Sequence, residues 1–87
     1  MEIIIRHNGV YLKNANLGKG FAGMTADLVL NKYGRVTVVG SKLSFLTDLN
    51  RIPVEILDAV TKSLEKEAGN RILEKIKEKI QRTKSIE

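Results

Sequence analysis

The stretch Gly18–Gly23 (GKGFAG) comes closest to a binding motif in residue type and spacing. Its glycines fit G-x-G-x-x-G, a pattern in which backbone N–H groups can close around a phosphate. A dinucleotide site also needs a helix opening at the last glycine and an acid about 20 residues on, whereas a P-loop needs Gly-Lys-Ser/Thr. Lys42 and Leu43 stand where the acid belongs, and Lys19 is followed by Gly20. We therefore expect a mobile connection in which Lys19 is a candidate phosphate contact, and we keep anion or nucleotide binding here as a weaker hypothesis.

Side chains that could perform catalysis are sparse. The chain has no cysteine, His7 is its single histidine, and neither Ser41 nor Ser44 has a sequence partner that would activate it. Neighbouring carboxylates occur only among lysines in the C-terminal half, where pairing at i,i+4 on a solvated helix explains them: Glu65, Glu67, Glu74 and Glu78. We expect His7 to be an exposed turn residue, and we expect no enzyme, no metal and no cofactor.

The positive charge is placed unevenly. The net charge is +5; residues 1–51 hold seven basic and three acidic residues, and residues 52–87 hold eight basic and seven acidic ones. Such asymmetry is typical of proteins with a polyanionic partner, although a charged surface that keeps a small protein in solution is an equally simple explanation. The candidate nucleic-acid contacts are Arg6, Lys13, Lys19, Lys32, Arg35 and Lys42, with Tyr11 and Tyr33 as candidate stacking residues. The stretch Lys75–Lys84 is interpreted as a solvated helix face.

Two β-hairpins are predicted to present these cations. In the first, residues 2–13, Asn8-Gly9 is the strongest two-residue turn signal, and it pairs Arg6 with Tyr11 and Ile5 with Leu12. The core face of this hairpin should then carry Ile3, Ile5, Val10 and Leu12, and its other face Ile4, Arg6, Tyr11 and Lys13.

The second hairpin is predicted over residues 26–40, with Lys32–Gly34 as a three-residue loop and Gly34 in the left-handed conformation. Its core face should carry Leu28, Leu30, Val36 and Val38. A helix over residues 22–33 is the competing prediction, which the alternating pattern disfavours. Residues 41–51 are ambiguous, with 42–46 as a candidate short strand.

The C-terminal half is predicted to be helical, opening at Pro53. Two apolar stripes, one before and one after Gly69-Asn70, are offset by roughly 115° on a helical wheel that advances 100° per residue. Gly69 offers a helix stop and Asn70 a new N-cap. Two amphipathic helices, 53–68 and 71–83, are favoured over one continuous helix. Ile72, Ile76 and Ile80 of the second stripe are candidates for an oligomer interface.

Length and composition place the chain among small α+β proteins. We expect 87 residues to form a single domain, with a β-rich basic half (1–51) and a helical half (52–87). No apolar run is long enough to span a bilayer, and the start (MEIII) lacks signal-peptide features, so we expect no membrane association and a cytoplasmic protein. Abundant Lys, Glu and Ile lean towards a thermophilic source.

Two short segments resemble DNA-binding families. Pro53–Val60, with Gly69 and a second amphipathic helix, is similar to the helical part of ribbon-helix-helix repressors, in which a strand before the proline pairs with its copy and reads the major groove. The preceding residues 48–52 do not alternate as that ribbon does. Lys32–Val38 resembles the opening of swapped-hairpin antitoxin and transition-state regulators, although the proline and basic helix that follow there are missing. Both resemblances imply dimeric DNA binding.

These observations favour a non-enzymatic, homodimeric protein that binds DNA or RNA through basic hairpin surfaces. The alternative is a homo-oligomeric interaction or adaptor module in which the charge only solubilises the chain.

Overall fold

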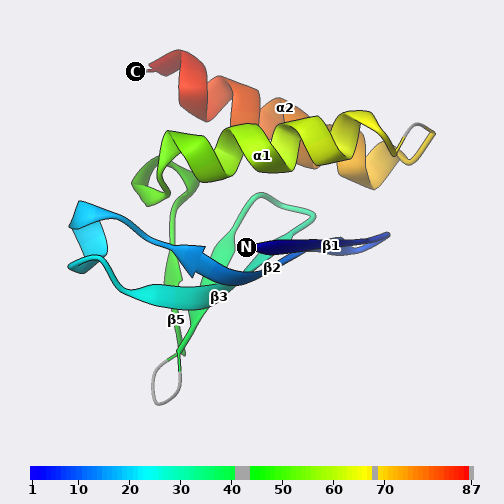
Figure 1. Ribbon diagram of the computed structural model, residues 1–87. Coiled ribbons are helices and arrows are strands. Elements are labelled where there is room, and N and C mark those ends of the chain that lie inside the picture. Colours follow the sequence, from blue (N-terminus) through cyan, green and yellow to red (C-terminus); the bar gives the residue numbers. More distant parts are fainter. Residues whose placement is uncertain (41–43, 68, 87) are drawn as a thin grey trace.

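The computed structural model describes residues 1–40, 44–67 and 69–86. A five-stranded antiparallel sheet lies under two helices, with the strands in sequence order from β1 to β5 (Figure 1). The strands are β1 (Glu2–Arg6), β2 (Gly9–Asn16), β3 (Thr25–Asn31), β4 (Val36–Val39) and β5 (Ser44–Thr47). The helices are α1 (Val54–Glu65) and α2 (Arg71–Ile86). Two 3₁₀ turns lie between other elements: η1 (Lys19–Phe21) between β2 and β3, and η2 (Leu49–Arg51) between β5 and α1.

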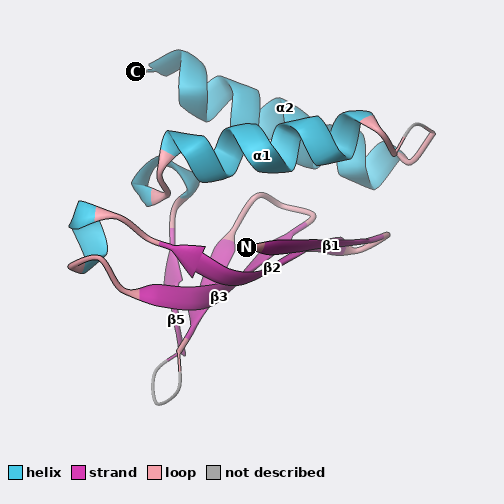
Figure 2. Ribbon diagram, in the orientation of Figure 1, coloured by secondary structure: helices cyan, strands magenta, loops and turns pink. Residues whose placement is uncertain are grey.

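Both helices lie on the same side of the sheet (Figure 2). The core between the layers is made of aliphatic side chains from alternate strand positions and from the inner helix faces. Val10, Val60, Ile76 and Ile80 are completely buried in it. The small α+β fold with a hairpin-built sheet and two C-terminal helices is therefore as predicted.

The first hairpin has the predicted faces but a different register. Arg6 pairs with Gly9 and Ile5 with Val10, so the turn is His7-Asn8 and Gly9 already belongs to β2. A Cβ on Gly9 would lie 2.5 Å from the Leu30 carbonyl oxygen, so close packing against β3 demands glycine here. The predicted Asn8-Gly9 turn was wrong, but the shift leaves each residue on its expected face because side chains alternate with a period of two.

The second hairpin agrees with the prediction. Leu30 pairs with Val36 and Leu28 with Val38, and Gly34 has φ of 80° in the loop. The Asn31 side-chain oxygen accepts hydrogen bonds from the N–H groups of Tyr33 and Arg35, which holds this turn closed. The competing helix over 22–33 was wrong.

Between the hairpins, β2 carries a bulge. Asn14 has φ of 56° and its N–H donates to the Asp27 carboxylate, where the β2–β3 register shifts. A bulge bends a strand and strengthens its twist. It accounts for the continuation of β2 to Asn16, beyond the predicted end of the hairpin at residue 13.

Two helices are present, as favoured. Gly69 has φ of 94°, and the Asn70 side chain accepts hydrogen bonds from the N–H groups of Ile72 and Leu73, as an N-cap does. Pro53 precedes the first residue of α1, and its carbonyl accepts from Ile56 and Leu57. The ion pairs in the described residues join the helices: Lys77 to Glu65 at 3.6 Å, and Lys84 to Asp58. Neither of these pairs has the expected i,i+4 spacing within one helix, and of the expected carboxylates only Glu65 takes part in them.

The segment before Pro53 differs from that of ribbon-helix-helix repressors. Leu49–Arg51 forms the 3₁₀ turn η2, so no ribbon strand leads directly into α1. The strand that does form, β5, pairs with β4 of the same chain. Lys32–Val38 likewise forms a turn and a strand within its own chain.

Candidate nucleic-acid interface

The sheet face turned away from the helices is organised in rows of side chains that cross the strands. The central row runs through directly paired residues of all five strands: Ile4, Tyr11, Val29, Thr37 and Leu46. The row beside it holds Arg6, Gly9 and Asn31, and Arg35 continues it because the Asn31 N–H donates to the Arg35 carbonyl. We call this surface the open face.

Turn positions place further cations near the second row. In an antiparallel meander alternate turns lie at the same end of the sheet, so the β1–β2 and β3–β4 turns are neighbours. Arg6 therefore lies at the end of the sheet that also carries Lys32 and Arg35. The Arg6 guanidinium lies 5.8 Å from the Tyr11 ring centroid, and Lys32 Nζ lies 5.1 Å from that of Tyr33.

Two adjoining hollows extend this end of the sheet towards α2. One, of about 340 Å³, lies beside Arg35 and Arg51, and the other, of about 330 Å³, beside Lys79 and Arg82. Asp48 borders both and is the one carboxylate among their lining residues. In the described part of the chain no ion pair within 4.0 Å involves any of these four cations. We call the whole set the cationic band: Arg6, Lys32, Arg35, Arg51, Lys79 and Arg82.

The structure divides the predicted cations between the two ends of the sheet. Arg6, Lys32 and Arg35 come together in the cationic band. Lys13 lies towards the opposite end, paired with Glu2, and Lys19 lies in the β2–β3 connection. Lys42 lies outside the described residues. Sequence reasoning missed Arg51, Lys79 and Arg82, because only the packing of η2 and α2 against the sheet end brings them near Arg35.

The glycine motif is closed on itself. The N–H of Gly18 donates to the Asn16 side chain, and those of Phe21 and Gly23 donate to the Gly18 carbonyl. The Ala22 N–H donates to Lys19. These N–H groups are therefore not free to surround a phosphate, and strand β3 rather than a helix follows the last glycine.

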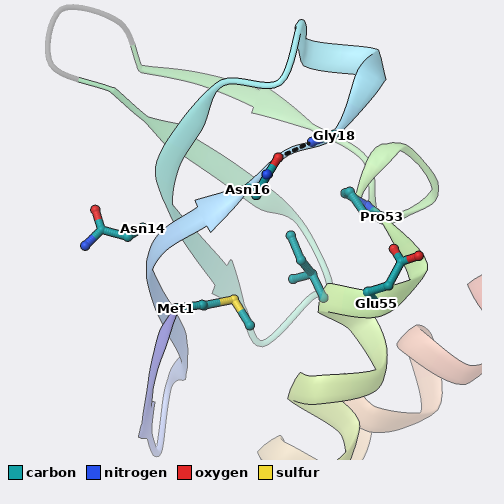
Figure 3. A pocket seen from close by; sticks show the side chains of 7 residues that line it. Met1, Asn14, Asn16, Gly18, Pro53 and Glu55 are labelled. Atoms are coloured by element: carbon teal, nitrogen blue, oxygen red, sulfur yellow. Dashed lines mark hydrogen bonds between the residues drawn. The ribbon is translucent and has the colours of Figure 1, made fainter.

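A hollow of about 450 Å³ lies beside this connection (Figure 3). Its lining includes Met1, Asn16, Gly18, Pro53 and Glu55. Glu55, at the start of α1, is its one ionisable side chain, and a carboxylate disfavours an anion. The arrangement does not favour the predicted anion site at Gly18–Gly23.

Comparisons with known proteins identify no relative of this chain, so a function can be inferred only from the geometry described above. No protein-family model, curated protein or solved structure gives a significant match to the chain.

The remaining candidates occupy ordinary structural positions. His7 is an exposed turn residue. Ile76 and Ile80 are fully buried in the core and Ile72 is partly buried against it, so the chain's own fold covers the apolar stripe assigned to an oligomer interface. Among residues 1–40, 44–67 and 69–86, no group of three His, Asp or Glu side chains is placed to hold a metal ion, and no helix is long and apolar enough to cross a membrane.

Proposed function

We propose that this protein binds nucleic acid through the cationic band and the adjoining row of the open face. The observation that carries the proposal is that six cations from four separate segments of the chain lie around one end of the sheet. Four of them line the two hollows, among whose lining residues Asp48 is the one carboxylate. Lys and Arg side chains that are not paired internally neutralise phosphates and release counterions. We therefore infer that the partner of the cationic band is a flexible polyanion.

Salt dependence tests this proposal. The association constant should fall as salt is added. Arg6→Ala and Arg35→Ala should each make the slope of its logarithm against log[salt] less steep by about 0.7–0.9, the value for one lost phosphate contact. The measurement is fluorescence anisotropy with a labelled oligonucleotide, DNA or RNA, between about 50 and 200 mM salt.

The matched controls are Lys62→Ala and Lys66→Ala, which remove the same charge from exposed positions outside the cationic band, on α1 and just after it. Their slopes should stay at the wild-type value. Equal losses at Lys62 and Arg35 would show that binding follows net charge alone, and absence of binding at tens of micromolar at about 50 mM salt would refute the proposal.

Self-association through strand β5 is a second candidate function. β5 is an edge strand with no charged residue in Ser44–Thr47, its Leu46 is 65% exposed, and Val39 beside it on β4 is also exposed. Natural edge strands are usually protected by charges because their free N–H and C=O groups pair with other chains. The opposite edge, β1, carries Glu2 and Arg6.

Leu46→Lys should therefore weaken a homodimer by up to about fivefold, because like charges facing each other across a β5–β5 contact cost up to about 1 kcal/mol. Light scattering at several protein concentrations measures the change. Tyr33→Lys, which replaces a similarly exposed apolar residue in the β3–β4 turn, is the matched control and should leave the mass unchanged. A wild-type protein that is monomeric at all concentrations contradicts this second function.

A further inference from the structure

Tyr11 lies at the centre of the open face, beside the row that holds Arg6 and Gly9. It is half-buried, pairs with Ile4 and Val29 in the central row, and has the Arg6 guanidinium near its ring. Its neighbour on the same strand in the adjacent row is Gly9, which has no side chain, and its diagonal neighbour on β1 is Arg6. On the side of the cations the tyrosine ring therefore adjoins the Arg6 guanidinium and a position of β2 that has no side chain.

Charge changes across the open face from row to row. The row on one side of Tyr11 holds Arg6 and Arg35, about 14 Å apart, since they are separated by three inter-strand spacings of about 4.8 Å. The row on its other side holds Glu2, paired with Lys13, and Asp27, whose carboxylate is engaged by the bulge. A phosphate chain is attracted to the first of these rows only.

This arrangement distinguishes single strands from duplexes. In a duplex the bases are stacked on each other and only their edges face the grooves, so an aromatic ring lying on a sheet surface cannot reach a base plane. In a single strand the bases turn out and stack on aromatic or guanidinium planes, while cations follow the backbone. The open face offers the Tyr11 ring beside the Arg6 guanidinium, which is itself the first member of the row of cations.

We propose that the ligand is single-stranded nucleic acid, which crosses the strands with its phosphates along the row from Arg6 to Arg35 and one base stacked on Tyr11. This inference rests on the proposed function and deepens it by naming the ligand class. Every base has a π-face, so binding is largely independent of sequence. The cationic band then guides the strand away from the sheet towards α2.

Affinity for a single-stranded 12-mer and for the matching duplex, measured by anisotropy at one salt concentration, is the first test. The single strand should bind at least tenfold more tightly. Tyr11→Leu should weaken single-strand binding about tenfold, because loss of a stacked aromatic has effects of this order, whereas Tyr11→Phe should retain it. Phe45→Leu is the control, because it removes an aromatic ring from the opposite face of the sheet, where Phe45 stacks on Phe21 at 5.9 Å.

Photo-crosslinking supplies a readout that a merely structural role of Tyr11 would not produce. Irradiation of the complex with an oligonucleotide containing 5-iodouracil should attach the base to Tyr11, identified by mass spectrometry of the digested adduct. Thermal unfolding of each variant establishes that it is folded. Crosslinking elsewhere, with unchanged affinity of a folded Tyr11→Leu variant, overturns the stacking inference.

The outcomes separate the inference from the function on which it rests. Duplex binding as tight as single-strand binding, with normal sensitivity to Arg6→Ala, overturns the single-strand inference and leaves the proposed function intact. No binding to either form removes both.

Discussion

Ile76→Ala is expected to lower the free energy of unfolding by about 2–5 kcal/mol. The Ile76 side chain is completely buried between α2 and the sheet, so its truncation removes apolar burial and leaves a cavity. A small α+β chain without disulfides has little stability to spare. Urea denaturation followed by circular dichroism measures the change, and the midpoint should fall well below that of the wild type.

The adjacent variant Lys75→Ala is the matched control, because Lys75 is exposed on the same turn of α2. It should change the unfolding free energy by no more than about 0.5 kcal/mol. Both variants should behave alike at low and high protein concentration, since the chain itself covers Ile76. A loss of stability that depends on protein concentration would instead show that the apolar stripe of α2 lies between subunits.

Much of the fold could be predicted from local signals in the sequence. Gly34 in a three-residue loop identified the second hairpin, and Gly69-Asn70 between two offset stripes identified the break between the helices. Both signals act through the conformation of one or two residues, which the amino-acid type largely determines. The buried faces of both hairpins followed from alternation, which does not depend on where the turn is centred.

The remaining features depend on contacts between distant segments. The β5 strand forms because β4 offers a partner edge, and its short sequence carries little pattern of its own. The cationic band draws Arg51 from η2 and Arg82 from α2, and no spacing in the sequence indicates that these residues meet Arg35. Only three of the six band members were therefore among the predicted contacts.

The two groups of predicted cations differ in what surrounds them. Lys13 stands opposite Glu2, and Lys19 lies in the connection next to the hollow lined by Glu55. Arg6 and Arg35 stand beside uncharged neighbours in their own row, with Gly9 and Asn31 between them. Total charge in the N-terminal half indicated a polyanion partner, but the sheet register determines which cations lie together.

That register makes Gly9 the residue whose replacement tests the geometry of the open face most directly. Gly9→Asn is expected to lower the free energy of unfolding by about 2–3 kcal/mol, because any Cβ here meets the Leu30 carbonyl oxygen at 2.5 Å and forces β2 away from β3. Urea denaturation measures the loss. The choice of asparagine matters: a turn residue with positive φ accepts Asn readily, whereas a strand residue pressed against a neighbouring backbone accepts no side chain.

Gly34→Asn is the matched control, because Gly34 has φ of 80° and the atoms nearest to its added Cβ belong to the flexible Lys79 side chain. It should lower stability by about 1 kcal/mol or less. If instead Gly9→Asn is harmless, the turn is centred on Asn8-Gly9 after all, and Arg6 stands directly opposite Tyr11. Arg6 would then belong to the central row with Tyr11 and Val29 and would no longer share a row with Arg35, so the proposed path for the phosphates would be lost. The same variant therefore tests both the hairpin register and the physical basis of the proposed binding face.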